Sequence, residues 1–332
     1  MKVIHLYPNF DNIGGAQSMI IELYLGMKQR NIEVKIAGLT SYSLINDRYK
    51  LKIEKSDYIK LDFSFFLKKN DSVLISHHRK LTSFFVMLSK FLFFRLSIVH
   101  VSHNEFFNFK FLTFFPKKII AVSEKVKSNL MSVFNVDKSR ISVIYNGLES
   151  KKGDCSKRDF IKNDIIKLLY PARITSVKQQ LELVKEIKKS KIQNIKIVFC
   201  GDGVNYNDLV QLVGKDTRFV VKGLVENMDE EYLNCDFVLL FSKKEGLPVS
   251  LIEACNFSKP IICNDVGGNL EIVEDNVNGF VVNSYSSLIK RIEELKKITK
   301  VDYEFLSENS KVVFEKKFKK AIMLNKYTQY VK

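Results

Sequence analysis

The first half of the chain alternates between short apolar runs and longer stretches in which apolar residues recur at helical spacing. Short runs of this kind predict buried strands, and the helical spacing predicts amphipathic helices. The expected strands are Val3–Tyr7, Glu33–Ala37, Ser72–Ile75, Ser97–Val101, Lys118–Val122 and Ser142–Tyr145. The expected helices are Gln17–Gln29, Lys80–Phe91 and Lys125–Phe134. Strands that alternate with helices predict an α/β fold, with a parallel sheet covered by helices on both faces.

A polar, charged stretch at Glu149–Lys162 interrupts this alternation, and we expect it to be an interdomain linker. The alternation then resumes for the rest of the chain. The expected strands of the second half are Ile166–Tyr170, Ile195–Cys200, Phe219–Val221, Phe237–Phe241, Pro260–Cys263 and Gly279–Val282. The pattern therefore predicts two Rossmann-like domains in succession.

Composition agrees with two domains, because 332 residues with 46% hydrophobic content can fill two cores. The five cysteines show no C-x-x-C or His-rich spacing, which argues against a zinc site or a disulfide framework and favours a reducing compartment. Met1–Pro8 is too short an apolar run for a signal peptide. Lys90 and Arg95 interrupt the apolar run Leu81–Val101, so no membrane-spanning helix is expected there. These features predict a cytoplasmic protein.

The formal net charge is +16 and is uneven along the chain. Residues 1–150 carry 22 Lys and Arg against 12 Asp and Glu, a net of +10, and residues 151–332 carry 31 against 25, a net of +6. The surplus predicts attraction to an anionic partner, which leaves nucleic acid, a membrane surface and a phosphorylated substrate open. The lysines are scattered and no nucleic-acid-binding motif is present, so nucleic acid is the least favoured of the three.

The most distinctive segment, residues 245–275, reads EGLPVSLIEACNFSKPIICNDVGGNLEIVED. Glu245 and Glu253 lie eight residues apart, and Pro248 stands between them where an apolar helix is expected to begin. A helix start offers free N–H groups to phosphate, and two carboxylates can accept hydrogen bonds from sugar hydroxyls. An arbitrary pair of glutamates at this spacing would more often be solvated at the surface. The residues around this pair decide between the two interpretations.

The whole pattern resembles glycosyltransferase family 4, the retaining nucleotide-sugar enzymes of the GT-B fold. The family pattern E-G-hydrophobic-P-x4-E-A, a later proline and G-G-x-x-E is matched by Glu245, Gly246, Leu247, Pro248, Glu253, Ala254, Pro260, Gly267, Gly268 and Glu271. The later d-x-x-N-G-F of the family is matched by Asp275–Phe280. The resemblance implies an active site in the cleft between two Rossmann-like domains. It also implies that Glu253 binds the ribose hydroxyls and that Glu245 binds hydroxyls of the donor sugar.

Two motifs of the first half gain meaning from this resemblance. Gly14, Gly15 and Ala16 follow the first expected strand, and G-x-G-x-x-G is absent, so a dinucleotide site is not expected. In family 4 such a turn faces the donor diphosphate and the acceptor, with Gln17 as a nearby polar candidate on the acceptor side. His103 follows the strand Ser97–Val101, where open α/β sheets place ligands. The resemblance implies that His103 faces the donor sugar or the acceptor, beside Asn104; His77 and His78 are weaker candidates.

Three motifs of the second half also follow expected strands. Arg173 and Lys178 match the family element G-R-x4-K, although Ala172 stands where glycine is usual. Two cations there suit neighbouring phosphate oxygens, and isolated basic residues in so lysine-rich a chain would normally be solvated. Gly201 and Gly203 match the family's G-D-G loop near the nucleoside, and Gly223 with Leu224 matches the family's segment whose backbone lies against the base.

The expected reaction needs no resident cofactor. The chain has no D-x-D motif, and cations with a helix start can stabilise a leaving diphosphate, so metal-independent transfer is expected. The implied partners are a nucleotide-sugar donor, expected to be a UDP-sugar, and a glycan or lipid-linked acceptor in surface polysaccharide biosynthesis. The resemblance implies a front-face mechanism in which the leaving phosphate helps to accept the acceptor proton. The alternatives are a GT-B nucleotide-sugar epimerase, a phosphorylase, which would need pyridoxal phosphate, or a basic nucleic-acid-binding protein.

These considerations predict three parts of the chain. Residues 1–155 form an acceptor-binding domain and residues 163–308 form a donor-binding domain. Residues 309–332 form a C-terminal helix, whose apolar residues recur at helical spacing. The resemblance implies that this helix crosses back to the first domain, and simple packing on the second domain is the alternative.

A segment rich in phenylalanine and lysine raises the question of membrane contact. Its aromatic residues are Phe84, Phe85, Phe91, Phe93, Phe94, Phe106, Phe107, Phe109, Phe111, Phe114 and Phe115, and its basic residues are Lys90, Arg95, Lys110, Lys117 and Lys118. Aromatic rings beside cations suit the interface of an anionic bilayer, and the alternative is that the rings fill the core of the first domain. Phe106–Phe115 is the better membrane candidate, which would place the protein at the inner face of the cell membrane.

Overall fold

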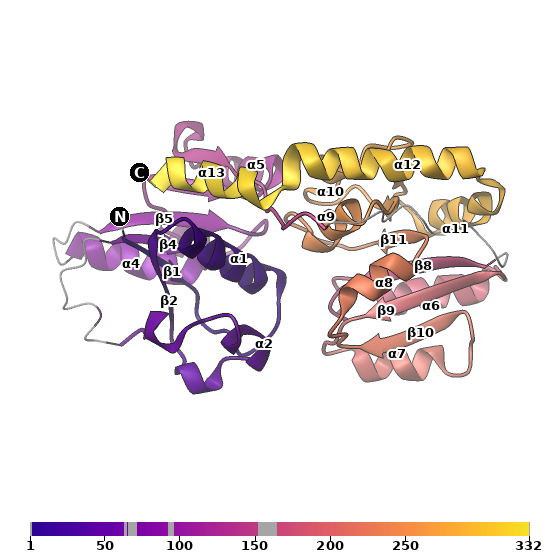
Figure 1. The fold of residues 1–332 in the computed structure, drawn as a ribbon, viewed down its shortest axis with the longest axis horizontal. Helices are drawn as coiled ribbons and strands as arrows, with labels where there is room; N and C mark the ends of the chain where they lie inside the picture. The colour runs from indigo at the N-terminus through magenta and orange to yellow at the C-terminus, as the bar shows by residue number, and fades with distance from the viewer. Residues whose placement is uncertain (1, 63–64, 66–71, 92–95, 152–164, 332) are drawn as a thin grey trace. The chain divides into compact units, whose positions relative to one another are not determined.

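The computed structural model describes residues 2–62, 65, 72–91, 96–151 and 165–331, and it divides the chain into two compact units (Figure 1). Unit 1 comprises Met1–Glu149 together with Lys319–Lys332, and unit 2 comprises Ser150–Phe318. Most of the expected linker at 149–162 lies outside the described residues, as do Cys155, Phe93, Phe94 and Arg95.

Unit 1 is built on a seven-stranded parallel sheet in the order β3-β2-β1-β4-β5-β6-β7. Its strands are β1 Lys2–Leu6, β2 Glu33–Gly38, β3 Tyr58–Lys60, β4 Val73–Ser76, β5 Ser97–Ser102, β6 Lys118–Ala121 and β7 Ile141–Val143. Its helices include α1 Gly15–Gln29, α2 Asp47–Lys50, α4 Arg79–Phe91, α5 Glu124–Phe134 and α13 Lys320–Val331. The six strands and three helices expected in this half are confirmed, with ends that differ by one or two residues.

The strand β3 was not expected from the sequence. It is only three residues long and reads Tyr-Ile-Lys, so it has no apolar run. It forms the edge of the sheet by pairing with β2, and the Tyr58 hydroxyl donates to the carbonyl of Thr40 at 2.8 Å. An edge strand held by tertiary contacts leaves little signal in the sequence.

Unit 2 contains a six-stranded parallel sheet in the order β10-β9-β8-β11-β12-β13. Its strands are β8 Ile166–Pro171, β9 Ile195–Cys200, β10 Phe219–Gly223, β11 Phe237–Leu240, β12 Ile261–Cys263 and β13 Gly279–Val281. Its helices include α6 Gln180–Lys189, α7 Tyr206–Val213, α8 Met228–Asn234, α9 Val249–Asn256, α10 Asn269–Ile272, α11 Tyr285–Glu294 and α12 Lys300–Val313. The strand order reverses between β8 and β11, and the loops after such strands are where open α/β sheets bind ligands.

The last helix, α13, is part of unit 1. Its Lys320 Nζ donates to Glu22 on α1 at 2.9 Å, and Met323 Sδ accepts from the N–H of Gly147 at 3.2 Å. Gly26 allows α1 to approach it closely, because a Cβ there would lie 2.4 Å from a methyl group of Leu324. A π-helical turn at Phe314–Phe318 separates α13 from α12.

Candidate active site

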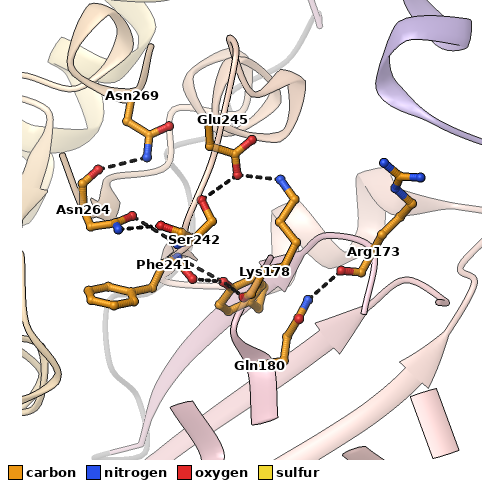
Figure 2. Close-up of polar contacts among 9 residues, drawn as sticks. Arg173, Lys178, Gln180, Phe241, Ser242, Glu245, Asn264 and Asn269 are labelled. Carbon is orange, nitrogen blue, oxygen red and sulfur yellow. Dashed lines mark hydrogen bonds and ion pairs between the residues drawn. The ribbon is translucent and has the colours of Figure 1, made fainter. Parts of the chain in front are cut away.

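The segment that follows β8 places two cations at the carboxyl edge of the unit 2 sheet. Lys178 Nζ lies 2.5 Å from Glu245 Oε1 (Figure 2). Arg173 is exposed, and its guanidinium makes no hydrogen bond or ion pair with the described residues, while its carbonyl accepts from Gln180 Nε2 at 2.9 Å. The buried Tyr170 hydroxyl lies 2.7 Å from the carbonyl of Phe241 and 2.5 Å from that of Lys178. This contact fixes the segment against β11 and leaves the Arg173 guanidinium available to a ligand.

A buried polar network holds the Glu245 carboxylate. Glu245 is 6% exposed, and its Oε1 also accepts from Ser242 Oγ at 2.7 Å. Asn264 bonds both backbone groups of Ser242, at 3.1 and 2.7 Å, and Asn269 Nδ2 donates to the carbonyl of Asn264 at 2.9 Å (Figure 2). A charge at this depth needs a partner and hydrogen bonds, which Lys178 and Ser242 provide. Ser242, Asn264 and Asn269 were not predicted from the sequence.

The glycine pair at 267–268 lies directly against the loop that carries Glu245. The N–H of Gly268 donates to the carbonyl of Gly246 at 2.9 Å. Gly267 has φ +57°, and a Cβ there would lie 2.1 Å from the Glu245 carbonyl oxygen. Both the conformation and the close approach require glycine. The two halves of the motif are therefore one structural unit.

The helix expected after Glu245 begins at Val249, with Pro248 immediately before it at φ −70°. Leu247 is 5% exposed and belongs to the core. Glu253 lies on α9, and its Oε2 accepts from the Tyr232 hydroxyl of α8 at 2.7 Å. Burial, with the Glu253 carboxylate nearby, raises the pKa of Tyr232 well above its usual value, so this hydroxyl remains a donor. Tyr232 is a fourth residue of the site that was not predicted from the sequence.

The loop at Gly201–Gly203 packs on the Arg173 segment. A Cβ at Gly201, where φ is +147°, would lie 2.2 Å from the Ala172 carbonyl, and one at Gly203 would lie 2.3 Å from that of Ile174. The N–H of Gly201 also donates to the carbonyl of Gly223 at 2.7 Å, next to Leu224, which is 62% exposed. The structure thus brings the expected donor loops after β8, β9 and β10 together at one sheet edge.

In unit 1, Gly14 precedes α1, and Gly15 and Ala16 form its first turn. The N–H of Gly14 donates to the Tyr49 hydroxyl at 3.2 Å. The Gln17 side chain folds back over Gly14, because a Cβ there would lie 2.5 Å from Gln17 Oε1. A Cβ at position 14 would only displace the flexible end of the Gln17 side chain, and the backbone of Gly14 is extended, with φ −160°.

Histidines gather after the strands β4 and β5. His103 is partly buried, and its Nε2 lies 2.9 Å from His77 Nδ1, while Asn104 is exposed. His100 is separate, with its Nδ1 2.7 Å from Thr82 Oγ1. Burial lowers the pKa of His103 to about 4 and that of His100 to about 3, so both rings are neutral near pH 7. His77 contacts His103 directly, although its sequence position made it only a weaker site candidate.

The described part of the chain contains neither a metal-binding cluster nor a membrane-spanning helix. No group of three or more His, Cys, Asp or Glu side chains is arranged there to hold a metal ion. Among the helices that the structure describes, none is long and apolar enough to cross a bilayer.

Two family models match successive parts of the chain. The model described as "Glycosyl transferases group 1" matches residues 155–312, and that described as "Glycosyltransferase Family 4" matches residues 13–152. Together they match most of each unit and include the candidate residues of both.

Individual relatives agree with these models. The chain is 30% identical over 146 residues to the putative glycosyltransferase EpsD of Bacillus subtilis, which covers 42% of this chain and 38% of EpsD. It is 24% identical to the capsular polysaccharide biosynthesis glycosyltransferase CapH of Staphylococcus aureus, over 82% of this chain and 83% of CapH. It is also 24% identical to the UDP-Gal:alpha-D-GlcNAc-diphosphoundecaprenol alpha-1,3-galactosyltransferase of Escherichia coli, over 59% of each. The chain spans less than two thirds of several of the curated relatives that it matches, between 38% and 58%.

The fold is also that of solved structures. Anabaena HepE, solved in complex with UDP, superposes with a TM-score of 0.80 at 16% identity, over 99% of both chains. The expected α/β fold with two parallel sheets is confirmed as the GT-B fold. From the two family models and this fold, the chain belongs to the group 1/family 4 glycosyltransferases.

Proposed function

We propose that this protein transfers a sugar from a UDP-sugar to a glycan or lipid-linked acceptor in surface polysaccharide biosynthesis, with retention of anomeric configuration. The observation that carries the proposal is the Lys178–Glu245 pair at the carboxyl edge of the unit 2 sheet, within the E-x7-E segment. A cation and a carboxylate held side by side suit a phosphate and the hydroxyls of the attached sugar.

The cations act on the leaving group. In the transfer, the bond between the sugar C1 and the diphosphate oxygen breaks, and its electron pair leaves with that oxygen. Arg173 and Lys178, with the start of α9, stabilise this charge as it develops. The acceptor oxygen bonds to C1 on the face that the diphosphate leaves, and its proton passes to the leaving phosphate oxygen. No resident metal or organic cofactor has a role in these steps.

The carboxylates bind the two ends of the donor. Glu245 accepts hydrogen bonds from hydroxyls of the transferred sugar, while Ser242 and Lys178 hold its orientation. Glu253 accepts from the ribose hydroxyls, and Tyr232 holds its second oxygen. Gly201, Gly203 and Leu224 border the nucleoside. Within unit 1, Gly14 to Ala16, Gln17, His103 and Asn104 are the candidates for contact with the donor or the acceptor.

The identities of donor and acceptor take support from relatives. HepE was solved with UDP, and the Escherichia coli relative is named for UDP-Gal and a diphosphoundecaprenol acceptor. CapH is named for capsular polysaccharide biosynthesis. These names favour a UDP-sugar and a lipid-linked or glycan acceptor for this chain as well.

A lipid-linked acceptor fits an exposed apolar surface of unit 1. The surface, which we call the aromatic platform, is formed by Phe107, Phe109, Phe111 and Leu112, which are 67%, 55%, 91% and 70% exposed. Lys110 and Lys117 are exposed beside them in the sequence, whereas Phe85 of the same aromatic-rich segment is fully buried in the core. Exposed rings beside cations suit the headgroup region of an anionic membrane. We infer that the protein binds peripherally to such a membrane.

A panel of nucleotide sugars tests the proposed function. The protein is incubated with each donor, with and without an extract of lipid-linked saccharides and with and without EDTA. We expect acceptor-dependent release of UDP that survives EDTA. Isomerised donor without an acceptor would instead indicate an epimerase, and pyridoxal phosphate absorbance would indicate a phosphorylase. Complete, Mg²⁺-reversible inhibition by EDTA would contradict metal independence.

A further inference from the structure

Three histidines of unit 1 form a chain of hydrogen bonds that ends at His103. His5 lies in β1, His77 follows β4, and His103 follows β5, and these three strands are neighbours in the sheet. His5 Nδ1 lies 2.9 Å from His77 Nε2, and His77 Nδ1 lies 2.9 Å from His103 Nε2. His5 and His77 are buried, at 0% and 4% exposure, whereas His103 is partly exposed. The chain therefore runs from the core to an accessible ring.

All three rings are neutral at physiological pH. Burial lowers the pKa of His5 to about 3 and that of His103 to about 4, and burial together with neighbouring histidines lowers that of His77 well below its usual value. In the described residues, no carboxylate is hydrogen-bonded to these rings to favour a charged form. A neutral imidazole has one N–H donor and one acceptor nitrogen. The N–H groups of the three hydrogen-bonded histidines can then all donate in only one of two directions, toward His5 or toward His103.

The buried end decides between the two directions. His5 Nε2 is buried and has no hydrogen-bond partner among the described residues. If His103 donated to His77 and His77 donated to His5, His5 would carry its proton on Nε2. A buried N–H without an acceptor is rare and costly. In the opposite order, the Nδ1–H of His5 donates to His77 Nε2 and the Nδ1–H of His77 donates to His103 Nε2. His103 then accepts at Nε2 and carries its own proton on Nδ1.

We propose that His5 and His77 are positioning residues that hold His103 as the Nδ1–H tautomer, so that His103 offers a hydrogen-bond donor to an oxygen of the bound sugar or acceptor. No hydrogen bond from His103 Nδ1 to the described residues is present, which leaves this N–H for a ligand. An imidazole whose Nε2 is occupied and whose Nδ1 is protonated cannot take the acceptor proton. The ligand in this proposal rests on the proposed function, whereas the tautomer does not.

Nitrogen NMR of the full-length protein tests the tautomer directly. All five histidines of the chain lie in unit 1, so a ¹⁵N-histidine-labelled sample gives five ring systems, and the His103→Gln spectrum identifies the ring of interest. At pH 7.5 we expect His103 to show a protonated Nδ1 and an unprotonated Nε2. A His103 ring that is mainly Nε2–H would overturn the proposal, whether or not the protein shows transferase activity.

Substitution tests whether the chain sets this tautomer. His77→Phe keeps the ring volume and removes both nitrogens, so His103 should lose its Nδ1–H preference, and His5→Phe should weaken that preference without touching His103. His100→Phe is the matched control, because His100 is equally buried but bonds Thr82 instead. We expect His77→Phe to slow transfer about tenfold, because the His103 Nδ1–H is no longer held toward the ligand. UDP binding should be unchanged. If His103 kept the same tautomer in both His77→Phe and His5→Phe, the hydrogen bonds from His5 and His77 would not be what sets it.

Discussion

Glu245 is a nearly buried carboxylate, and its compensating charge comes from Lys178, a residue that is 67 positions away in sequence. Removing one partner of such a pair leaves the other charge buried and uncompensated. Arg173 differs, because it is exposed and bonds nothing in the described chain through its guanidinium. The roles of the two cations can therefore be distinguished by experiment. Lys178 stabilises the fold as well as the ligand, whereas Arg173 is available for the ligand alone.

At this scale we predict that Arg173→Ala and Lys178→Ala each lower turnover roughly tenfold or more, because the developing diphosphate charge loses a preorganised partner. Lys178→Ala should also lower the free energy of unfolding by on the order of 3 kcal/mol, through the unpaired Glu245. Arg173→Ala should leave that free energy unchanged. Steady-state kinetics and urea unfolding of unit 2 check both statements. Turnover at the wild-type rate in both variants would remove these residues from the mechanism.

At the scale of elements, every strand of the two sheets except β3 could be predicted from apolar runs, and the start of α9 from Pro248. The buried network behind Glu245 could not. Asn264 follows β12 and Ser242 follows β11, and they meet only because these strands are neighbours in the sheet. The contact between Tyr232 and Glu253 likewise joins separate helices. Such contacts depend on strand order, which local periodicity does not encode.

The glycine at 267 offers a test of the loop contact. Gly267→Ala adds both left-handed strain and a Cβ that would meet the Glu245 carbonyl at 2.1 Å, so it should displace the loop and weaken UDP-sugar binding roughly tenfold or more. Gly214→Ala is the matched control. Its φ is +59°, and the nearest atom to its Cβ is 3.8 Å away, so it adds strain alone, about 1 kcal/mol. Equal donor affinity in the two variants, measured by calorimetry, would mean that the close approach has no part in binding.

At the scale of the whole molecule, the histidines distinguish the two units. All five lie in unit 1, and all five, His5, His77, His78, His100 and His103, have lowered pKa values. Between these values and the usual 6.5, the unfolded chain binds protons that the folded unit does not. The stability of unit 1 must therefore fall as the pH falls below about 6.5.

We predict that this acid sensitivity appears in unit 1 and is weaker in unit 2. Each neutral buried histidine contributes a slope of about 1.4 kcal/mol per pH unit in this window. Native-state hydrogen exchange between pH 7 and pH 5 resolves the two units and measures the opening free energy of β1 and β4. His100→Phe should reduce the pH dependence of the opening free energy of unit 1 by the contribution of one histidine, about 1.4 kcal/mol per pH unit. A slope of zero in unit 1 would show that these histidines are not held neutral.

Membrane binding is also a property of the whole molecule. We predict that the protein sediments with anionic liposomes at low salt, and that Lys110→Glu with Lys117→Glu, or Phe111→Ser with Leu112→Ser, releases it. Lys118 is omitted because its Nζ donates to the Tyr330 carbonyl at 3.0 Å. Leu51→Ser is the control, since Leu51 is 90% exposed outside the aromatic platform. Full activity on a water-soluble acceptor without any liposome binding would contradict a membrane role for the platform.

The most direct test of the proposed donor site is calorimetric titration of UDP and of the active UDP-sugar into the wild type, Glu253→Gln and Glu245→Gln. We predict that Glu253→Gln weakens binding of UDP itself, because the ribose hydroxyls lose a charged acceptor. Glu245→Gln should bind UDP as the wild type does and lose affinity only for the sugar-bearing donor, with impaired transfer. Equal loss of UDP affinity in both variants would contradict the division of the two carboxylates between ribose and sugar.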